Sequence, residues 1–304
     1  MRSDQPLVTI LTDTKNRASL ISRCIESIQK QTYQNYEHII ADGGSDNTEE
    51  IVRSYNDPRI KYVKVPTGGP VAQTKIAFEM SKGEFITFLY DDDEYLPNKL
   101  EKQLELMLSL SEEYGFIYGA MSYYDFNTGE YLYDHKAELE GGKEILPIAI
   151  SGAFVCGTPT FMFRREVFQS IGGTWVASIG NERSDWALGC KVLMNGWKVA
   201  PLKESYLRIN VNHNAVRLSN ENFYRDSSER YIKFHNYFLR EYSEIIKEYP
   251  KSGVIHYEGL IYNYIRVSRF SDALKVWKKL ICARTNLRSF LLLPYYAFNY
   301  IFRR

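Results

Sequence analysis

The stretch Phe85-Ile86-Thr87-Phe88-Leu89-Tyr90-Asp91-Asp92-Asp93-Glu94-Tyr95-Leu96-Pro97 runs from an apolar segment directly into four acidic residues. Its apolar part predicts a buried strand. Adjacent carboxylates repel one another, so three aspartates at a strand end are stable mainly when a positive charge lies among them. A hard divalent cation that accompanies a phosphate-bearing ligand would supply that charge, and an acidic turn exposed to water is the alternative.

The residues before this stretch alternate between strand and helix patterns. Strands are predicted over 7–11, 38–41 and 60–65, each followed by a helix-forming segment. This order predicts a parallel sheet with helices on both faces, in which ligands bind at the carboxyl ends of the strands. Asp13, Asp42 and the acidic cluster all stand at such ends, so a shared site is expected there.

Composition and charge restrict the class of protein. The 304 residues suffice for one large α/β domain with an appendage or for two domains. A net charge of +1 gives no nucleic-acid signature. The four cysteines lack CxxC spacing, and the N-terminus is polar, so we expect reduced thiols, no signal peptide and a cytoplasmic location.

Glycine-rich phosphate-binding loops are not found in the sequence. There is no GxGxxG after the first strand and no GxxxxGK[ST] motif. Without such a loop, the negative charge of a bound nucleoside diphosphate would be neutralised by a metal ion. The other strand-end acids could accept hydrogen bonds from a base or a ribose.

Four segments in order resemble the family 2 glycosyltransferases of the GT-A fold. They are VTILTDTKNR (8–17), CIESIQKQTY (24–33), IIADGGSDNT (39–48) and GEFITFLYDDDEYLP (83–97), and the likeness extends over roughly residues 7–210. The resemblance implies an α/β fold with a Rossmann-like mixed sheet flanked by helices. It also implies inverting, metal-dependent transfer of a sugar from a nucleotide diphosphate sugar, expected to be a UDP-sugar, to an acceptor hydroxyl.

The same resemblance implies roles for particular residues. Asp42 would bind the base, and Mn²⁺ or Mg²⁺ would be held by Asp92 and Asp93 of a DxD-type motif. Asp91 is the alternative metal ligand, because Tyr90 stands where many members have the first Asp. The donor would be contacted by Thr12, Asp13, Thr14, Asn16, Arg17, Asp42, Lys75, Asp91, Asp92, Arg208 and His213.

Asp185 is the expected catalytic base. It precedes a helical pattern that stops at Gly196, where the family places a Glu-Asp motif, and Ser184 here replaces the first member. The reaction needs a carboxylate that takes the proton from the attacking hydroxyl. A plain helix N-cap is a compatible alternative role, and Glu182 is the second candidate.

The resemblance fades near residue 220. We expect a catalytic domain over 1–220 and a helical extension over 221–304 that associates with a membrane or with another copy of the chain. The tail 290–304 is apolar and aromatic with flanking arginines, but shorter than the roughly 20 residues that a membrane-spanning helix needs. An interfacial helix on the cytoplasmic membrane face is one interpretation, and a helix packed on the protein is the other.

The sequence therefore predicts a hexosyl- or N-acetylhexosaminyltransferase of polysaccharide biosynthesis. Its acceptor would be a glycan or a lipid-linked saccharide. A sugar nucleotidyltransferase is one alternative, although the glycine-rich signature of that class is absent near the first strand. A noncatalytic nucleotide-binding or scaffold protein on the same fold is the other.

Overall fold

The computed structural model describes residues 5–67, 69–153, 157–174, 176, 179, 184–212, 228–283, 292 and 295–296. The chain divides into two compact units. The first comprises Met1–Lys143, Val155–Trp175 and Lys191–Ala215, and the second comprises Glu144–Phe154, Val176–Cys190 and Val216–Arg304. The helical unit thus takes two segments from the middle of the chain, which the boundary expected at residue 220 did not anticipate.

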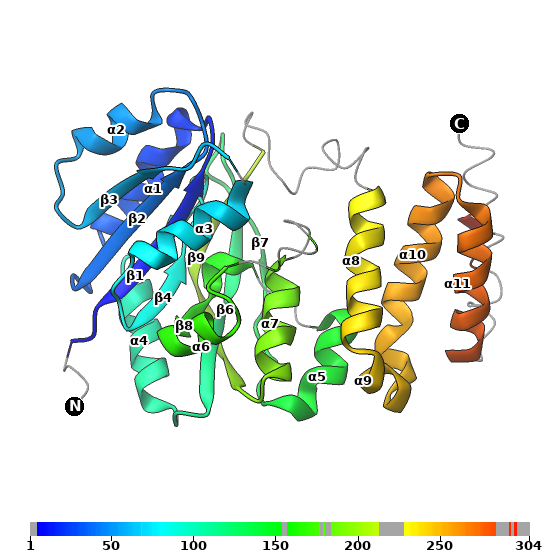
Figure 1. Ribbon diagram of the computed structural model, residues 1–304. Helices are drawn as coiled ribbons and strands as arrows, with labels where there is room; N and C mark the ends of the chain where they lie inside the picture. The colour runs from blue at the N-terminus through cyan, green and yellow to red at the C-terminus, as the bar shows by residue number, and fades with distance from the viewer. Residues whose placement is uncertain are drawn as a thin grey trace. The chain divides into compact units, whose positions relative to one another are not determined.

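The first strands form the parallel half of the sheet, drawn in blue and cyan in Figure 1. β1 (Val8–Thr14) pairs in parallel with β2 (Tyr36–Asp42) on one side and with β4 (Phe85–Phe88) on the other. β3 (Ile60–Lys64) adds in parallel to β2. Every residue of β2 and β4 is buried, as expected for apolar strands covered on both faces.

The second half of the sheet mixes strand directions. The nine strands follow the order β3-β2-β1-β4-β8-β6-β9-β5, with β7 paired to β6. Antiparallel pairs join β8 to β4 and β6, β5 to β9, and β7 to β6, whereas β6 and β9 are parallel. The bounds are β5 (Glu94–Tyr95), β6 (Tyr114–Asp125), β7 (Tyr131–His135), β8 (Met162–Arg164) and β9 (Lys198–Val211). The mixed sheet confirms the predicted fold class.

One face of the sheet is covered by α1 (Ala18–Gln29), α2 (Thr48–Ser54) and α4 (Lys99–Ser109). Apolar residues at helical spacing in α1 form one cluster with Leu100 and Leu104 of α4 and with residues of β1, β2 and β4. This packing explains why α1 forms: its apolar positions recur every three or four residues, and burial of that face stabilises the helix.

The opposite face is covered by α3 (Gly69–Met80) and α6 (Arg165–Ser170). Phe78 of α3 packs edge to face on Phe168 of α6 with ring centroids 5.0 Å apart. Phe168 in turn contacts Phe88 of β4 at 5.4 Å. The sheet is therefore enclosed between two helical layers. A ligand can reach it at the ends of the strands, where ligands of such sheets bind.

The second unit is helical. It contains α5 (Leu146–Ile148), the start of α7 (Ser184–Met194), α8 (Ser228–Glu241), α9 (Ser243–Glu248), α10 (Val254–Arg266) and α11 (Phe270–Ala283). Its core joins Ile232, Leu260, Ile261 and Leu280 from three of these helices. α10 and α11 pack together in this core and lie side by side in Figure 1.

Most of the predicted tail lies outside the described residues. Where it is described, Leu292 is buried in the helical core and Tyr296 packs against it, whereas Tyr295 is exposed. This packing favours the interpretation of a tail docked on the protein at these positions. Among the described helices, none is both long and apolar enough to span a membrane.

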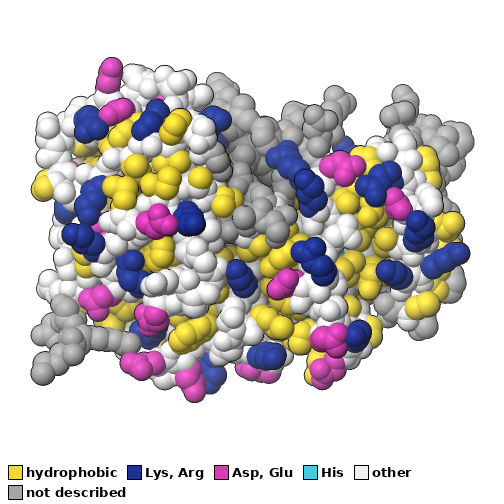
Figure 2. Space-filling view, viewed as in Figure 1, with side chains coloured by type: hydrophobic (Ala, Val, Ile, Leu, Met, Phe, Trp, Pro, Cys, Tyr) yellow, Lys and Arg dark blue, Asp and Glu magenta, His cyan; other side chains and the backbone are white. Residues whose placement is uncertain are grey.

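Charged side chains of both signs are spread over the face drawn in Figure 2, as the near-neutral net charge suggests. Dark blue and magenta groups alternate with hydrophobic ones rather than forming a broad field of one sign. Cys24, Cys190 and Cys282 are free thiols in the part of the chain that the structure describes, which does not include Cys156.

Candidate active site

The parallel strands bring their carboxyl ends to one edge of the sheet. Thr14, the last residue of β1, is in register with Asp42, the last residue of β2. β4 pairs with β1 up to Phe88 and then leads into the acidic turn formed by residues 91–93. All three aspartates of the turn are buried, as is Asp42, so they do not form a solvated acidic loop.

Asp91 is held between β1 and the loop that follows β1. Thr14 Oγ1 donates to Asp91 Oδ2 at 2.7 Å, and Arg17 Nη1 lies 2.7 Å from Asp91 Oδ1 and 3.1 Å from Asp92 Oδ2. Burial raises the pKa of Asp91 to about 6; Arg17 and Thr14 oppose this rise, and Asp92 adds to it. Arg17 thus supplies the positive charge that the aspartates require.

The charge of Arg17 is itself stabilised by the turn. Burial alone would lower the pKa of its guanidinium, but the charges of Asp91 and Asp92 raise that pKa overall. The arginine therefore remains protonated while two carboxylates share one of its nitrogens. Such charge-assisted bonds are among the strong hydrogen bonds of a protein interior.

Asp93 faces β9 instead of Arg17. The backbone N–H of Asn210 donates to Asp93 Oδ1 at 3.0 Å. The side-chain amide of Asn210 donates to Asp92 O and to Glu94 Oε1, both at 3.0 Å. Asn210 therefore fastens the acidic turn to β9.

The oxygen donors of the turn fit a hard divalent cation that shares its coordination with a substrate. Mg²⁺ and similar ions take one or two carboxylates and complete their shell with phosphate oxygens and water. Asp92 and Asp93 can provide the carboxylates. Within the part of the chain that the structure describes, no group of three or more His, Cys, Asp or Glu residues is arranged to hold a metal by itself.

Asp42 is fully buried at the end of β2. Its Oδ1 accepts from the Gly44 N–H at 2.6 Å, and its Oδ2 accepts from the Tyr62 hydroxyl at 2.7 Å and from Lys64 Nζ at 2.8 Å. Lys64 is the last residue of β3, so a third strand end contributes a charge to this edge. Tyr62 and Lys64 were not among the site residues predicted from the sequence. A lysine at the end of a predicted parallel strand could have indicated Lys64.

The loops after β1 and β2 pack against each other. Asn16 Oδ1 accepts from the Ser45 N–H at 2.7 Å. Asn16 has a φ of 54°, a left-handed conformation that asparagine tolerates better than most residues. A Cβ on Gly44 would lie 2.4 Å from the backbone nitrogen of Asn16, so glycine is required for this approach.

Helix α3 contributes a residue that the sequence did not indicate. Gln73 Nε2 donates to Thr14 O and to Ala41 O, both at 2.8 Å, and so ties the ends of β1 and β2 together. The next residue, Thr74, donates to Asp13. Lys75 is exposed on the same helix. No charge or periodicity in the sequence distinguishes Gln73 from other polar residues of a helix.

Thr12 is directed into the interior of the sheet. Its hydroxyl donates to Leu89 O at 2.7 Å and lies 2.9 Å from His38 Nε2. Thr12 and His38 are both completely buried. These contacts link β1 to β2 and to the segment after β4, so Thr12 supports the strands that carry the site.

Arg208 lies on β9 beside the turn but contacts other partners. Its guanidinium lies 4.2 Å from the centroid of the Tyr124 ring. It donates to Asn210 Oδ1 at 3.1 Å and to Gly129 O at 3.3 Å. Oε1 of Glu94 lies 3.8 Å from Arg208 Nε.

Asp185 belongs to the second compact unit and stands in the first turn of α7, as predicted. Its Oδ1 accepts from the Trp186 N–H at 2.8 Å. The Trp186 indole donates to Ala149 O at 2.7 Å, which fixes the start of the helix within its unit. Glu182 and His213 lie outside the described residues.

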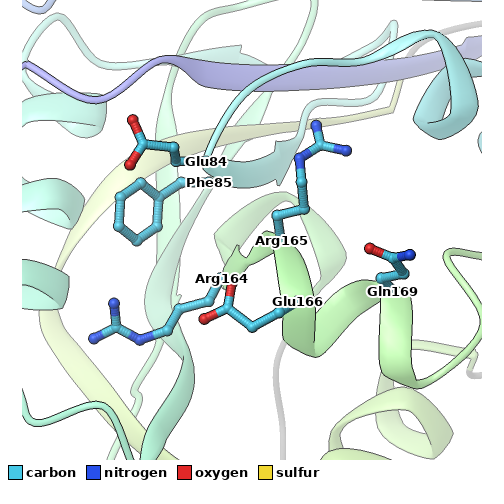
Figure 3. A pocket seen from close by; sticks show the side chains of 6 residues that line it. All are labelled: Glu84, Phe85, Arg164, Arg165, Glu166 and Gln169. Atoms are coloured by element: carbon cyan, nitrogen blue, oxygen red, sulfur yellow. The ribbon is translucent and has the colours of Figure 1, made fainter. Parts of the chain in front are cut away.

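A hollow of about 300 Å³ lies elsewhere in the first unit, where β4 begins. Figure 3 shows its lining side chains, with Arg164 and Arg165 directed away from each other. Arg164 donates to Tyr114 O at 2.9 Å, and Arg165 donates to Ser81 Oγ at 2.7 Å. The two arginines bind the protein itself and do not form a phosphate clamp, so this hollow is not the candidate site.

Residues 9–172, more than half of the chain, match the family described as glycosyl transferase family 2. The putative teichuronic acid biosynthesis glycosyltransferase TuaG of Bacillus subtilis is 36% identical over 121 residues, covering 38% of this chain and 48% of that protein. The putative colanic acid biosynthesis glycosyl transferase WcaA of Escherichia coli is 40% identical over 101 residues, covering 32% and 36%. The chain thus spans less than half the length of these curated relatives.

Solved structures show the same fold over nearly the whole chain. TarS 1-349 of S. aureus in complex with UDP-GlcNAc superposes with a TM-score of 0.59 at 15% identity, covering 97% of this chain and 91% of that one. The mannosyltransferase PcManGT of Pyrobaculum calidifontis, in complex with GDP-Man and Mn²⁺, gives 0.55 at 17% identity, covering 98% and 81%. The fold is that of the GT-A glycosyltransferases. With more than half of its residues matching the family, the chain belongs to glycosyl transferase family 2.

Proposed function

We propose that the chain is an inverting glycosyltransferase that moves a sugar of hexosyl or N-acetylhexosaminyl type from a UDP-sugar to a hydroxyl of a glycan or lipid-linked saccharide. The observation that carries the proposal is the buried cluster of Asp91, Asp92 and Arg17 at the same sheet edge as Asp42. UDP is favoured because TarS was solved with UDP and with UDP-GlcNAc. GDP is the second nucleotide to test, because PcManGT was solved with GDP-Man.

In this proposal Asp42 recognises the base. Each carboxylate oxygen can accept two hydrogen bonds, so Oδ1 can accept from a base N–H as well as from Gly44. Tyr62 and Lys64 hold the other oxygen and fix the direction of the carboxylate. The remaining donor contacts stay predictions: Asp13, Thr14, Asn16, Arg17, Lys75, Asp91, Asp92, Arg208 and His213.

The diphosphate is neutralised at the acidic turn. A divalent cation, Mn²⁺ or Mg²⁺, bound by Asp92 and Asp93 together with the diphosphate would offset the charge that grows on the leaving phosphate. Asn210 holds Asp93 and the backbone of Asp92 in place for this task. Arg17 opposes the rise that burial causes in the pKa of Asp91, and the same nitrogen also binds Asp92.

The transfer step needs a proton acceptor. The acceptor hydroxyl attacks the anomeric carbon, a new glycosidic bond forms, and the bond to the nucleoside diphosphate breaks on the opposite side of the sugar. The hydroxyl proton passes to the carboxylate of Asp185, and the nucleoside diphosphate leaves with the bonding electrons. The configuration at the anomeric carbon is thereby inverted.

The proposal also names the kind of biosynthesis in which the reaction takes part. TuaG and WcaA are named for the biosynthesis of teichuronic acid and colanic acid, so synthesis of a bacterial surface polysaccharide is the proposed context. The proposal also includes contact of the C-terminal tail with the cytoplasmic membrane face and the formation of homo-oligomers.

Calorimetric titration with UDP, GDP, CDP and dTDP, with and without Mn²⁺, tests the proposal directly. Metal-dependent binding of one nucleotide that is lost in Asp92→Ala is expected. Asp57→Ala is the matched control, since Asp57 pairs with Arg59 before the start of β3 and not at the carboxyl ends of the strands. Binding of no nucleotide would instead support the noncatalytic scaffold. A sugar nucleotidyltransferase would release pyrophosphate when it is given a nucleoside triphosphate and a sugar phosphate, which the proposed enzyme does not do.

A further inference from the structure

Two histidines meet in the interior of the second compact unit. His235 of α8 and His256 of α10 are buried, and their Nδ1 atoms lie 3.2 Å apart. His256 Nε2 lies 3.0 Å from Ile150 O and must carry a hydrogen, because a carbonyl oxygen only accepts. Burial lowers the pKa of His256 to about 4, so the ring is neutral at neutral pH and its Nδ1 accepts from His235 Nδ1–H. One backbone carbonyl thereby sets the tautomers of both rings.

The ring of His256 belongs to an aromatic cluster that reaches the start of α7. Phe238 of α8 stacks on His256 with ring centroids 4.4 Å apart, and the indole of Trp186 lies 5.3 Å from the same ring. Trp186 also contacts Phe234 and Phe238 at centroid distances of 5.5 and 5.0 Å. α8 and α10 lie side by side in Figure 1, and side chains from both of these helices contact the indole, which is buried.

Trp186 and His256 bind consecutive carbonyl groups of one segment. The Trp186 indole N–H donates to Ala149 O at 2.7 Å, and His256 Nε2 donates to Ile150 O at 3.0 Å. Both carbonyls belong to the short helical segment Ala149–Ala153 in the middle of the chain. A buried carbonyl that loses its donor costs free energy, so each of these hydrogen bonds resists displacement of its side chain.

Asp185 directly precedes Trp186 in the first turn of α7. The first N–H groups of a helix have no partner within the helix, so a first turn frays readily. Here the anchored indole restrains that turn, and the Trp186 N–H donates to Asp185 Oδ1 at 2.8 Å. Asp185 itself is half-buried, so its carboxylate can still be reached by a substrate. Within the second unit, a carboxylate that substrate can reach is thus attached to a side chain that cannot easily move.

We infer that Trp186 is a positioning residue, whose indole is fixed by His256 and by the segment Ala149–Ala153 and in turn fixes the carboxylate of Asp185 for proton transfer. The inference rests on the proposed role of Asp185 in glycosyl transfer. It makes the helical unit a part of the catalytic machinery. Asp42 and the acidic turn belong to the first unit, so disturbing the cluster should lower turnover and leave donor binding unchanged.

Hydrogen exchange followed by mass spectrometry tests whether the cluster holds the start of α7. His256→Phe keeps a flat ring and loses both hydrogen bonds, whereas in His256→Gln the side-chain amide can still donate to Ile150 O. Leu280→Ala is the matched control, because Leu280 is fully buried in the described core of the same unit, and that cluster does not include Trp186. Amides 186–190 should exchange about tenfold faster in His256→Phe and at near wild-type rates in the other two variants.

Trp186→Phe gives the same test should His256→Phe fail to fold. It keeps a ring in the cluster and removes the hydrogen bond to Ala149 O, so the same amides should again exchange faster.

Release of the nucleoside diphosphate tests whether this anchoring serves catalysis. UDP-GlcNAc, UDP-glucose, UDP-galactose and GDP-mannose are supplied with Mn²⁺, with water or a monosaccharide as acceptor. In His256→Phe, kcat should fall about tenfold at an unchanged KM for the donor, because a displaced base slows the chemical step without altering donor contacts. His256→Gln should recover most of this loss, and Leu280→Ala should keep the wild-type kcat.

A double variant separates positioning from a merely structural role. If His256 acts through Asp185, adding His256→Phe to Asp185→Asn should cause no further loss of kcat. A further loss, or a raised KM at unchanged kcat, would overturn the inference. Wild-type exchange in both His256→Phe and Trp186→Phe would overturn it as well, and so would equal acceleration in Leu280→Ala.

Failure of the proposed function has a different signature. Full turnover in Asp185→Asn would remove the proposed base and the positioning role with it. A wild type that releases no nucleoside diphosphate from any of the donors would remove the proposed transfer. Faster exchange confined to His256→Phe and Trp186→Phe would still establish that the cluster anchors the start of α7.

Discussion

The guanidinium of Arg17 lies 2.7 Å from the carboxylate of Asp91, although the two residues are 74 positions apart in the chain. The pair joins the loop after β1 to the turn after β4. The Arg17 side chain is 16% exposed and that of Asp91 is 3% exposed, so water screens their attraction poorly. The positive charge at the candidate donor site is thus built into the first twenty residues of the chain.

Replacing Arg17 by Gln should destabilise the fold. The substitution leaves Asp91 and Asp92 buried without their cation, and the free energy of unfolding should fall by on the order of 3 kcal/mol. Urea denaturation at pH 7 measures the loss. Arg53→Gln breaks an exposed pair with Glu49 and should cost less than about 1 kcal/mol. Equal losses in the two variants would contradict a special role for Arg17.

Replacing Gly44 by Ala should disturb the contact between the loops after β1 and β2. The new Cβ would meet the backbone nitrogen of Asn16 at 2.4 Å, so a loop must move, at a cost of about 1–3 kcal/mol. Binding of the preferred nucleotide should weaken as well, because Asp42 accepts from Gly44. Gly119→Ala is the control: its Cβ would meet Leu202 O at 3.7 Å, an ordinary contact. Unchanged denaturation and nucleotide binding in Gly44→Ala would refute this reasoning.

Replacing Asp185 by Asn should remove transfer and preserve donor binding. The amide oxygen can still accept from the Trp186 N–H, so the helix start is retained, but an amide is a poor proton acceptor. The turnover number should fall at least about a hundredfold. Sugar transfer and nucleotide binding are measured in parallel, with Glu166→Gln, an exposed acid in the first turn of α6, as control. Parallel loss of binding would show that Asp185 has a structural role.

The buried His38 should make stability depend on pH. Burial lowers its pKa from 6.5 to about 3, so the folded state keeps the ring neutral while the unfolded chain binds a proton below 6.5. The contribution is therefore fully present above pH 6.5 and is lost as pH falls from 6.5 towards 3. Between pH 7 and pH 5.5, protonation of His38 in the unfolded chain should lower the free energy of unfolding by about 1.3 kcal/mol.

The pH dependence of urea denaturation tests this assignment. Below pH 6.5, the free energy of unfolding of His38→Gln should fall less steeply with decreasing pH than that of the wild type. This comparison of slopes does not depend on the absolute stability of the variant. His135→Gln, in which a histidine on an exposed strand is replaced in the same way, is the matched control. A wild-type slope in His38→Gln would assign the acid sensitivity to other groups.

The sequence predicted the parallel strands and the acids at their ends because both depend on local patterns. β2 shows the principle: an apolar run predicts a buried strand, and an aspartate after it marks the strand end. Contacts between distant segments leave no such pattern. Neither the amide of Gln73 bridging two strands nor Asn210 fastening the acidic turn has a periodicity that could reveal it. The partners of Arg208 likewise depend on which strand lies beside β9, and sequence order does not give strand order.

The register shift between Tyr123 and Tyr124 makes the hairpin of β6 and β7 sensitive to length as well as to composition. Tyr123 pairs with Tyr133 and Tyr124 pairs with Tyr131, so Leu132 is an additional residue of β7 at this step, and its deletion would remove the bulge with every tyrosine still in the sequence. Relatives could therefore gain or lose this bulge, and the local twist that a bulge adds, through a single codon insertion or deletion. When such chains are compared, the spacing of the tyrosines in this hairpin will be more informative than their number.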